Sequence, residues 1–148
     1  MTERVDFYVL KSSTAKQRWS FACRLTEKAY LRDLKVVLLG DTPAEVEAID
    51  ALLWTFSERS FVPHDIHRGR ASDAAAVQLT QDLDFVESAD LLVNVSARLP
   101  VRLDRFARIA EIIDADDERR RLGRERFKAY RELRLAVETH QLDDAAGT

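Results

Sequence analysis

The chain has 148 residues, of which 46% are hydrophobic and 33% charged, values typical of one soluble globular domain with a single core. No apolar run approaches the roughly 20 residues of a membrane span, and the first residues, MTERVDFYVL, lack a signal-peptide pattern. The only cysteine, Cys23, excludes an internal disulfide and a multi-cysteine zinc site, and it fits a cytoplasmic protein.

Charge is unevenly distributed along the chain, whose net charge is -3. From Glu118 to Arg134 there are eight basic and three acidic residues, so this segment is +5 and the remainder is −8. A protein that binds nucleic acid over its whole surface is usually basic throughout. A single basic segment on an acidic body predicts a local anionic partner instead.

The first predicted elements are a strand, a helix and a second strand. Residues 4–10 (RVDFYVL) predict the first strand, and residues 15–30 predict a helix with apolar side chains on two sides. Residues 34–40 (LKVVLLG) form a near-continuous apolar run that ends at a glycine. Such a run is typical of a central parallel strand that is buried on both faces.

The segment 41–56 (DTPAEVEAIDALLWTF) has the clearest helix signal in the chain. Thr42 is the expected N-cap, Pro43 takes the first helical position, and Glu45 completes a capping box. Trp54 falls roughly 140° from the core stripe around the helix, so we expect it to project away from the core. That stripe consists of Val46, Ile49, Leu53 and Phe56.

The second half of the chain continues the alternation. After an extended segment and a loop that together cover 60–74, residues 75–80 and 89–95 predict two more strands. Residues 98–114 fit either a helix or a short helix followed by an edge strand, and we prefer the second alternative. Residues 118–138 predict one long helix.

Strands that alternate with helices over short connections predict an α/β fold, a single three-layer α/β/α domain with a mainly parallel sheet. We expect this domain to cover residues 1–140 and a polar, frayed tail to follow at 141–148. The fold class is Rossmann-like without a nucleotide-binding loop. The loops after the first two strands, KSSTAKQ and GDTPAE, contain neither a P-loop nor a G-x-G-x-x-G pattern, so no cofactor is expected.

No group of residues has the pattern of a catalytic or metal site. His64, Asp65 and His67 lie on one extended segment without a further partner, and zinc normally needs three or four convergent ligands. Cys23 falls on the presumed buried side of its helix, where a packed thiol is expected rather than a nucleophile. The sequence therefore predicts a protein that is not an enzyme by itself, with no metal.

A helical wheel divides the basic segment into two faces. Phe127 falls near 140° from Leu122, within the basic face rather than the apolar one, and Arg126 must escape along a flank or pair with an acid. The expected core face is Leu122, Ala129, Leu133 and Ala136. The expected cationic face is Arg120, Arg124, Lys128 and Arg131.

Three interpretations of Phe127 remain open. The face could be an ordinary solvated surface with the ring tucked under a neighbouring loop. Cations around an aromatic ring also match an acidic peptide that ends in an aromatic residue. Single-stranded nucleic acid is the competing ligand, because bases stack on aromatic rings while arginines hold phosphates.

A different class of function would be an α/β enzyme with an unrecognised pocket at the strand ends.

Four segments together resemble the chi subunit of bacterial DNA polymerase III holoenzyme. They are DFYVL in the first strand, ALLWTFSERSFVPHD at 51–65, LLVNVS at 91–96 and RERFKAYREL at 124–133. The resemblance implies a non-catalytic accessory subunit associated with the clamp loader. It also implies that the chain binds the acidic, Phe-terminated tail of single-stranded DNA-binding protein (SSB), and the psi subunit through another face.

The resemblance also implies site residues. The tail-binding site would use positions on the last helix together with one residue just before it: Ile113, Arg120, Arg124, Phe127 and Lys128. The surface that faces psi and the clamp loader would include Trp54 and Phe61. Direct nucleic-acid binding would be weak or absent.

Overall fold

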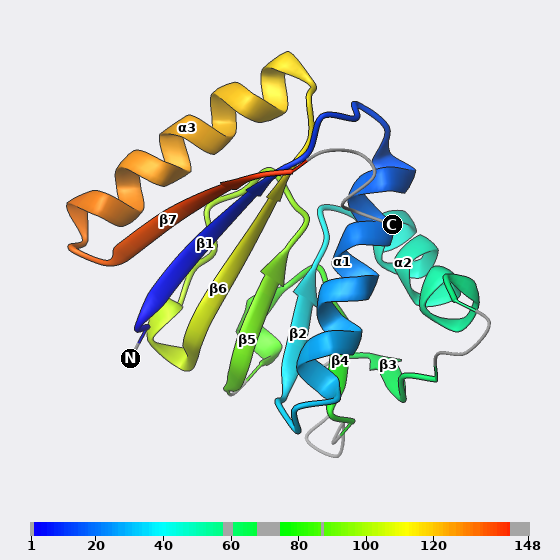
Figure 1. Ribbon diagram of the computed structural model, residues 1–148. Helices are drawn as coiled ribbons and strands as arrows, with labels where there is room; N and C mark the ends of the chain where they lie inside the picture. Colours follow the sequence, from blue (N-terminus) through cyan, green and yellow to red (C-terminus); the bar gives the residue numbers. More distant parts are fainter. Residues whose placement is uncertain (1, 58–60, 68–74, 87, 143–148) are drawn as a thin grey trace.

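The computed structural model describes residues 2–57, 61–67, 75–86 and 88–142. Within them, seven strands form one all-parallel sheet in the spatial order β3-β4-β2-β5-β6-β1-β7 (Figure 1). The strands are β1 Arg4–Val9, β2 Val36–Leu39, β3 His64–Ile66, β4 Val77–Thr80, β5 Ala89–Asn94, β6 Phe106–Ile113 and β7 Ala136–Gln141. The helices are α1 Ala15–Tyr30, α2 Pro43–Thr55 and α3 Asp117–Glu132, with short 3₁₀ turns at Leu83–Phe85 and Leu103–Arg105.

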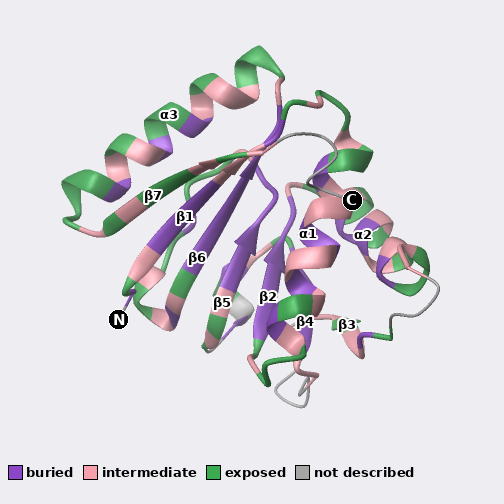
Figure 2. Cartoon of the chain, in the orientation of Figure 1, coloured by how far each residue is buried: buried purple, intermediate pink, exposed green. Residues whose placement is uncertain are grey.

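Helices cover both faces of the sheet, which confirms the predicted three-layer α/β/α arrangement. Helices α1 and α2 lie together over one face, and α3 lies alone over the other (Figure 1). Because side chains alternate along a strand, the sheet contributes to two core clusters. One lies under α1 and α2 and includes Leu38 and Ile49, and the other lies under α3 and includes Phe7 and Tyr130. All four residues of β2 are buried (Figure 2), as predicted for a central strand.

The start of α2 follows its sequence signals. Thr42 caps the helix by accepting a hydrogen bond from the N–H of Glu45 at 3.1 Å, and Pro43 is its first residue. The Glu45 carboxylate accepts from the N–H of Asp41 at 2.8 Å rather than from the N–H of Thr42, so the reciprocal bond reaches one residue further back than in a capping box. Of the predicted core stripe, Val46, Ile49 and Leu53 are buried and Phe56 is half-buried.

The predicted length of the last helix is wrong. Helix α3 ends at Glu132 rather than near 138, because Arg134 adopts a left-handed conformation with φ 62° and turns the chain back toward the sheet. The chain then forms β7, which pairs with β1 as far as Gln141, the first residue of the predicted tail. Residues 143–148 of that tail lie outside the described residues.

Strand β6 is an interior strand, so the edge position predicted for it is also wrong. It pairs with β5 on one side and β1 on the other, and helices cover both of its faces. A strand buried on both faces loses the period-two pattern, which is why its apolar spacing also fitted a helix. The short helix predicted before it is the 3₁₀ turn Leu103–Arg105. In the described part of the chain, no helix is both long and apolar enough to cross a membrane.

Candidate functional site

A buried ion pair fixes α3 to the sheet. Arg126 Nε lies 3.1 Å from the Glu111 carboxylate, and the guanidinium also donates to the carbonyl of Ala97 at 2.8 Å. Glu111 is fully buried and accepts hydrogen bonds from the Tyr130 hydroxyl at 2.6 Å and from the Asn94 amide at 3.0 Å. Burial raises the pKa of Glu111, against the opposing effect of Arg126 and the two hydrogen bonds. Of the two alternatives predicted for Arg126, escape along a flank or pairing with an acid, the structure confirms the second.

The core face predicted for α3 is wrong. Its buried residues are Gly123, Arg126 and Tyr130, whereas Leu133 is 57% exposed. Leu122 and Ala129 are half-buried, and Ala136 is an exposed residue of β7. The contact with the sheet uses an ion pair and a tyrosine, so the buried face of α3 does not coincide with its most apolar face. Gly123 allows close approach, since a Cβ there would lie 2.4 Å from Ile113 Cδ1.

Between α3 and the ends of β1 and β7 lies a pocket of about 260 Å³. Four of the five residues predicted for the tail site line it: Ile113, Arg120, Arg124 and Phe127. Lys128 is exposed on the same side of α3 but does not line the pocket. Sequence reasoning missed Phe7, Val9, Gly123, Thr139 and Gln141. The alternation of the first strand could have identified Phe7 and Val9, but the last two belong to a strand that was predicted as the end of a helix and the start of a tail.

Phe127 combines an exposed part with a buried one. The side chain is half-buried and packs against the core cluster under α3. Its ring centroid lies 5.3 Å from that of Phe7, at an angle of 57°. The guanidinium carbon of Arg131 lies 5.9 Å from the Phe127 centroid, a cation–π distance. The ring therefore packs on β1 rather than under a loop, and it still contributes to the pocket wall.

The basic residues at and near the pocket differ in whether other groups of the protein already bind their side chains. Arg120 Nε donates to the carbonyl of Asp114 at 3.2 Å, and its Nη2 lies 3.4 Å from the carbonyl of Leu10, which orients the guanidinium across the strand ends. Arg124 and Lys128 are exposed, and neither forms an ion pair with a described residue. These two charges are thus available to an anionic ligand.

On the other sides of α3 the arginines already have partners. Arg121 lies between Glu118 and Glu125, at 2.5 Å and 3.1 Å. Arg119 donates to the carbonyl of Val95 at 2.7 Å, toward the middle of the sheet. Among the described residues, Arg124 lines the pocket and forms no ion pair, so α3 presents an unmatched positive charge there.

The two residues predicted for the psi-facing surface lie together on the other side of the molecule. Trp54 is 51% exposed and Phe61 is 68% exposed, and their ring centroids are 5.6 Å apart. Trp54 also contacts the ring of His64 at 4.4 Å. The His64 side chain is buried and bonds the carbonyls of Val62 and Asp50, so it supports the aromatic surface from below.

Doubly wound proteins bind nucleotides at the carboxyl ends of the central strands. In this chain, side chains at that place form ion pairs and hydrogen bonds with one another. Arg18 is buried and lies 2.6 Å from Asp114 and 3.0 Å from Glu45. The indole N–H of Trp19 donates to Glu45 at 2.9 Å. Burial tends to raise the pKa of Glu45, but the N–H of Asp41, the Trp19 indole and Arg18 outweigh it and lower that pKa.

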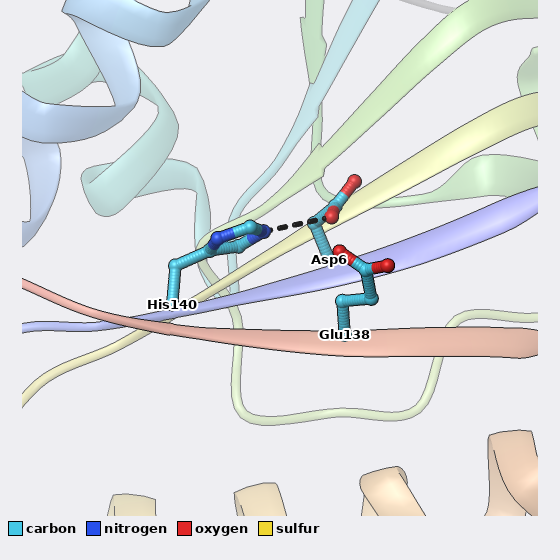
Figure 3. A group of neighbouring side chains, drawn as sticks. All are labelled: Asp6, Glu138 and His140. Carbon is cyan, nitrogen blue, oxygen red and sulfur yellow. Dashed lines mark hydrogen bonds and ion pairs between the residues drawn. The ribbon is translucent and has the colours of Figure 1, made fainter.

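A second ion-pair cluster joins β7 to β1 on the face opposite α3. A carboxylate oxygen of Asp6, one of Glu138 and a ring nitrogen of His140 lie within 4.8 Å of one another (Figure 3). Arg4 contacts Asp6 at 2.8 Å and Glu138 at 2.6 Å, and Arg108 contacts Asp6 at 3.1 Å. Because two guanidinium groups already neutralise these carboxylates, the cluster is suited to holding strands together rather than to binding a metal. Sequence reasoning missed it.

Residues 1–138 match the family model of the DNA polymerase III chi subunit, HolC. The chain belongs to this family. Chi is an accessory subunit of DNA polymerase III, and the chain is therefore a component of the DNA replication machinery.

Individual chi subunits are similar to this chain over most of their length. The chi subunit of Pseudomonas aeruginosa is 32% identical over 139 residues, which cover 94% of this chain and 96% of that protein. The Escherichia coli subunit is 23% identical, covering 87% and 91% respectively.

Among solved structures, T4 UvsW superimposes with a TM-score of 0.66 at 9% identity, covering 97% of this chain and 42% of UvsW. Domain 2 of the DEAD-box helicase Mss116p, bound to an RNA duplex, gives 0.56 at 12% identity, covering 93% and 64%. The chain thus spans less than two thirds of either structure, and at these identities the likeness shows the fold alone.

Proposed function

We propose that the chain is a non-catalytic, cytoplasmic chi subunit that binds the acidic, Phe-terminated tail of SSB and links it to the clamp-loader complex of DNA polymerase III. One observation carries this proposal. Unmatched cations on α3 and the ring of Phe127 border a single pocket. A ligand that satisfies both needs carboxylates and an aromatic end.

The proposed binding mode assigns a role to each side of the pocket. The terminal carboxylate of the tail would bind Arg124 and Arg120, and Lys128 would attract the aspartates upstream. The last aromatic ring would pack against Phe127 and Ile113, the apolar residues of the wall. We expect micromolar affinity, about −8 kcal/mol. Because the cationic residues are solvent-exposed, binding should weaken as salt is added.

The surface formed by Trp54 and Phe61 is the proposed contact for the psi subunit. Two large aromatic side chains that are exposed beside each other are unusual on a monomer surface. Aromatic residues of this kind are enriched among the residues that contribute most to protein–protein binding. Its position away from the pocket would allow both partners to bind at once.

Titration calorimetry with a synthetic tail peptide tests the proposal. Arg124→Ala should weaken binding at least fivefold, whereas Arg121→Ala should leave it unchanged, because Arg121 is paired with Glu118 and Glu125 outside the pocket. Equal affinity for wild type and Arg124→Ala would refute the assignment. A single-stranded oligonucleotide measured at the same salt distinguishes the competing ligand. Tighter binding of the oligonucleotide would favour a nucleic-acid-binding module.

A further inference from the structure

Strand β7 forms one edge of the sheet and is open on its outer side within the described residues. It pairs with β1 on its inner side only, and it is six residues long (Figure 1). The opposite edge strand, β3, has three residues and directly follows Pro63. Short edges and prolines protect a sheet against further pairing, whereas a longer open edge can template another strand. Among the described residues, only the β7 edge combines length with an open ladder.

The register identifies which backbone groups of β7 point outward. The N–H of Leu142 donates to the carbonyl of Val9 at 3.0 Å, in the direction of β1. Backbone groups alternate in direction along a parallel strand, so Glu138 and His140 also face β1. The N–H and C=O groups of Val137, Thr139 and Gln141 therefore face outward.

The same residues border the proposed tail site. The side chains of Thr139 and Gln141 line the pocket beside Arg124 and Phe127, while their backbone groups face the open edge. If the last residue of a peptide fills the pocket, the residues just upstream of it would therefore lie next to the unpaired N–H and C=O groups of β7. An extended segment can pair with such groups by β-strand addition.

Charge around the edge favours an acidic segment. The exposed cation Arg124 lines the pocket and Lys128 follows it by one helical turn, while Arg119 and Arg126 reach the other way, toward the middle of the sheet. The one acidic side chain of β7, Glu138, is paired with Arg4 at 2.6 Å on the opposite face. The side of the edge that faces α3 is thus electropositive.

The strand is held in place before any ligand arrives. A ring nitrogen of His140 lies 2.9 Å from the carboxylate of Asp6, within hydrogen-bond distance (Figure 3). The ring of His140 also stacks on that of Tyr8, with centroids 4.9 Å apart. These contacts, with the Arg4–Glu138 pair, fasten β7 to β1 on the face away from α3. Because the protein strand is already ordered, only the peptide loses conformational entropy on pairing.

We infer that the outer edge of β7 binds an extended acidic peptide as an eighth strand, which continues upstream from the residue held in the Phe127 pocket. This inference rests on the proposed function and adds a second source of affinity to it. The pocket selects the peptide end, and the backbone of Thr139 and Gln141 selects an extended main chain with free N–H groups.

A series of N-methylated peptides tests the inference. The probe is a nine-residue synthetic peptide with acidic residues upstream and a C-terminal phenylalanine, and single backbone N-methyl groups are placed at successive upstream residues. Only alternate residues of a strand face its partner. We expect methylation at alternate positions to weaken binding about fivefold, the net value of one backbone hydrogen bond, and methylation at the intervening positions to have little effect. A flat series would overturn the inference.

The matching protein variant is Thr139→Pro, which removes an outward N–H but no hydrogen bond to β1. Thr139→Ala is the control, because it truncates the side chain and keeps the N–H. We expect the proline variant to bind the nine-residue peptide about fivefold more weakly than the alanine variant. Urea denaturation shows whether the proline variant is folded; if it is not, the N-methyl series decides alone.

Two further results separate the inference from the proposed function. If the last three residues of the peptide bind as tightly as all nine, the pocket acts alone, which overturns the inference and leaves the proposed function intact. If neither peptide binds, the proposed function itself fails. Sedimentation of the wild type that shows a dimer, lost in Thr139→Pro, would mean that the edge pairs with a second copy, and this also overturns the inference.

Discussion

Replacing Arg126 tests whether the buried pair with Glu111 anchors α3. The Arg126 side chain is 5% exposed and that of Glu111 is 0% exposed. Arg126→Ala leaves a carboxylate in the interior with hydrogen bonds from Tyr130 and Asn94 but no positive charge. Breaking a buried pair in this way costs about 3–5 kcal/mol, a large part of a total stability of about 5–15 kcal/mol.

The stability lost in Arg126→Ala should depend on pH in a defined direction. Burial already raises the pKa of Glu111 above its usual 4.5, and loss of Arg126 removes the main opposing effect. A carboxyl with a raised folded-state pKa contributes stability that is complete below 4.5 and lost as the pH rises through the folded-state pKa. The difference between Arg126→Ala and wild type should therefore be largest at pH 7 and smaller at pH 5.

Urea denaturation at the two pH values measures this prediction. With a slope of about 2 kcal/mol per molar urea, the midpoint at pH 7 should fall by about 2 M. The control Arg121→Ala removes only exposed pairs and should cost less than about 1 kcal/mol. Glu111→Gln combined with Arg126→Met removes both charges and should cost less than Arg126→Ala alone. A loss below about 1 kcal/mol, or a deficit independent of pH, would refute the reasoning.

Three other outcomes follow from the structure. Gly123→Ala forces Ile113 to shift within the pocket, because the new Cβ would lie 2.4 Å from Ile113 Cδ1, so tail-peptide affinity should fall about threefold in calorimetry; an unchanged affinity would contradict this. Burial tends to raise the pKa of Asp6, but its hydrogen bonds from Arg4, His140 and Arg108 outweigh it and lower that pKa below 3.8. Asp6→Asn should therefore cost about 1–3 kcal/mol in urea denaturation above pH 4, with the difference vanishing as the pH falls through the folded-state pKa, and a constant difference would argue against it. Burial raises the pKa of the Cys23 thiol to about 12, so a thiol reagent at pH 8 should label it only after unfolding, and rapid labelling of the folded protein would disprove the buried position.

Local signals made part of the fold predictable. Thr42 and Pro43 determine the start of α2 through neighbouring residues, so a single sequence contains the required information. The run at 34–40 shows its burial directly, because a strand covered on both faces has no polar side. The wheel showed that Arg126 had either to escape along a flank or to pair with an acid, although it could not choose between the two or name Glu111.

Long-range contacts explain most of what the sequence did not reveal. Strand β7 (AVETHQ) has weak apolar alternation, and it forms because β1 pairs with it and Arg4 reaches Glu138 across 134 positions of the chain. The predicted helix therefore extended into it, and Thr139 and Gln141 were missed as pocket residues. The face of α3 was misplaced because its contact with the sheet depends on an arginine and a tyrosine that meet Glu111 from a distant strand.

A double-mutant cycle between the pocket ring and the tail's last ring tests the central claim most directly. Phe127→Leu removes the protein's ring while keeping apolar packing against Phe7, and a tail peptide ending in leucine removes the other ring. We predict that each change weakens binding and that the two losses are not additive, with a coupling energy of about 1 kcal/mol by calorimetry. Additive losses would show that the rings do not meet, which would contradict the proposed site.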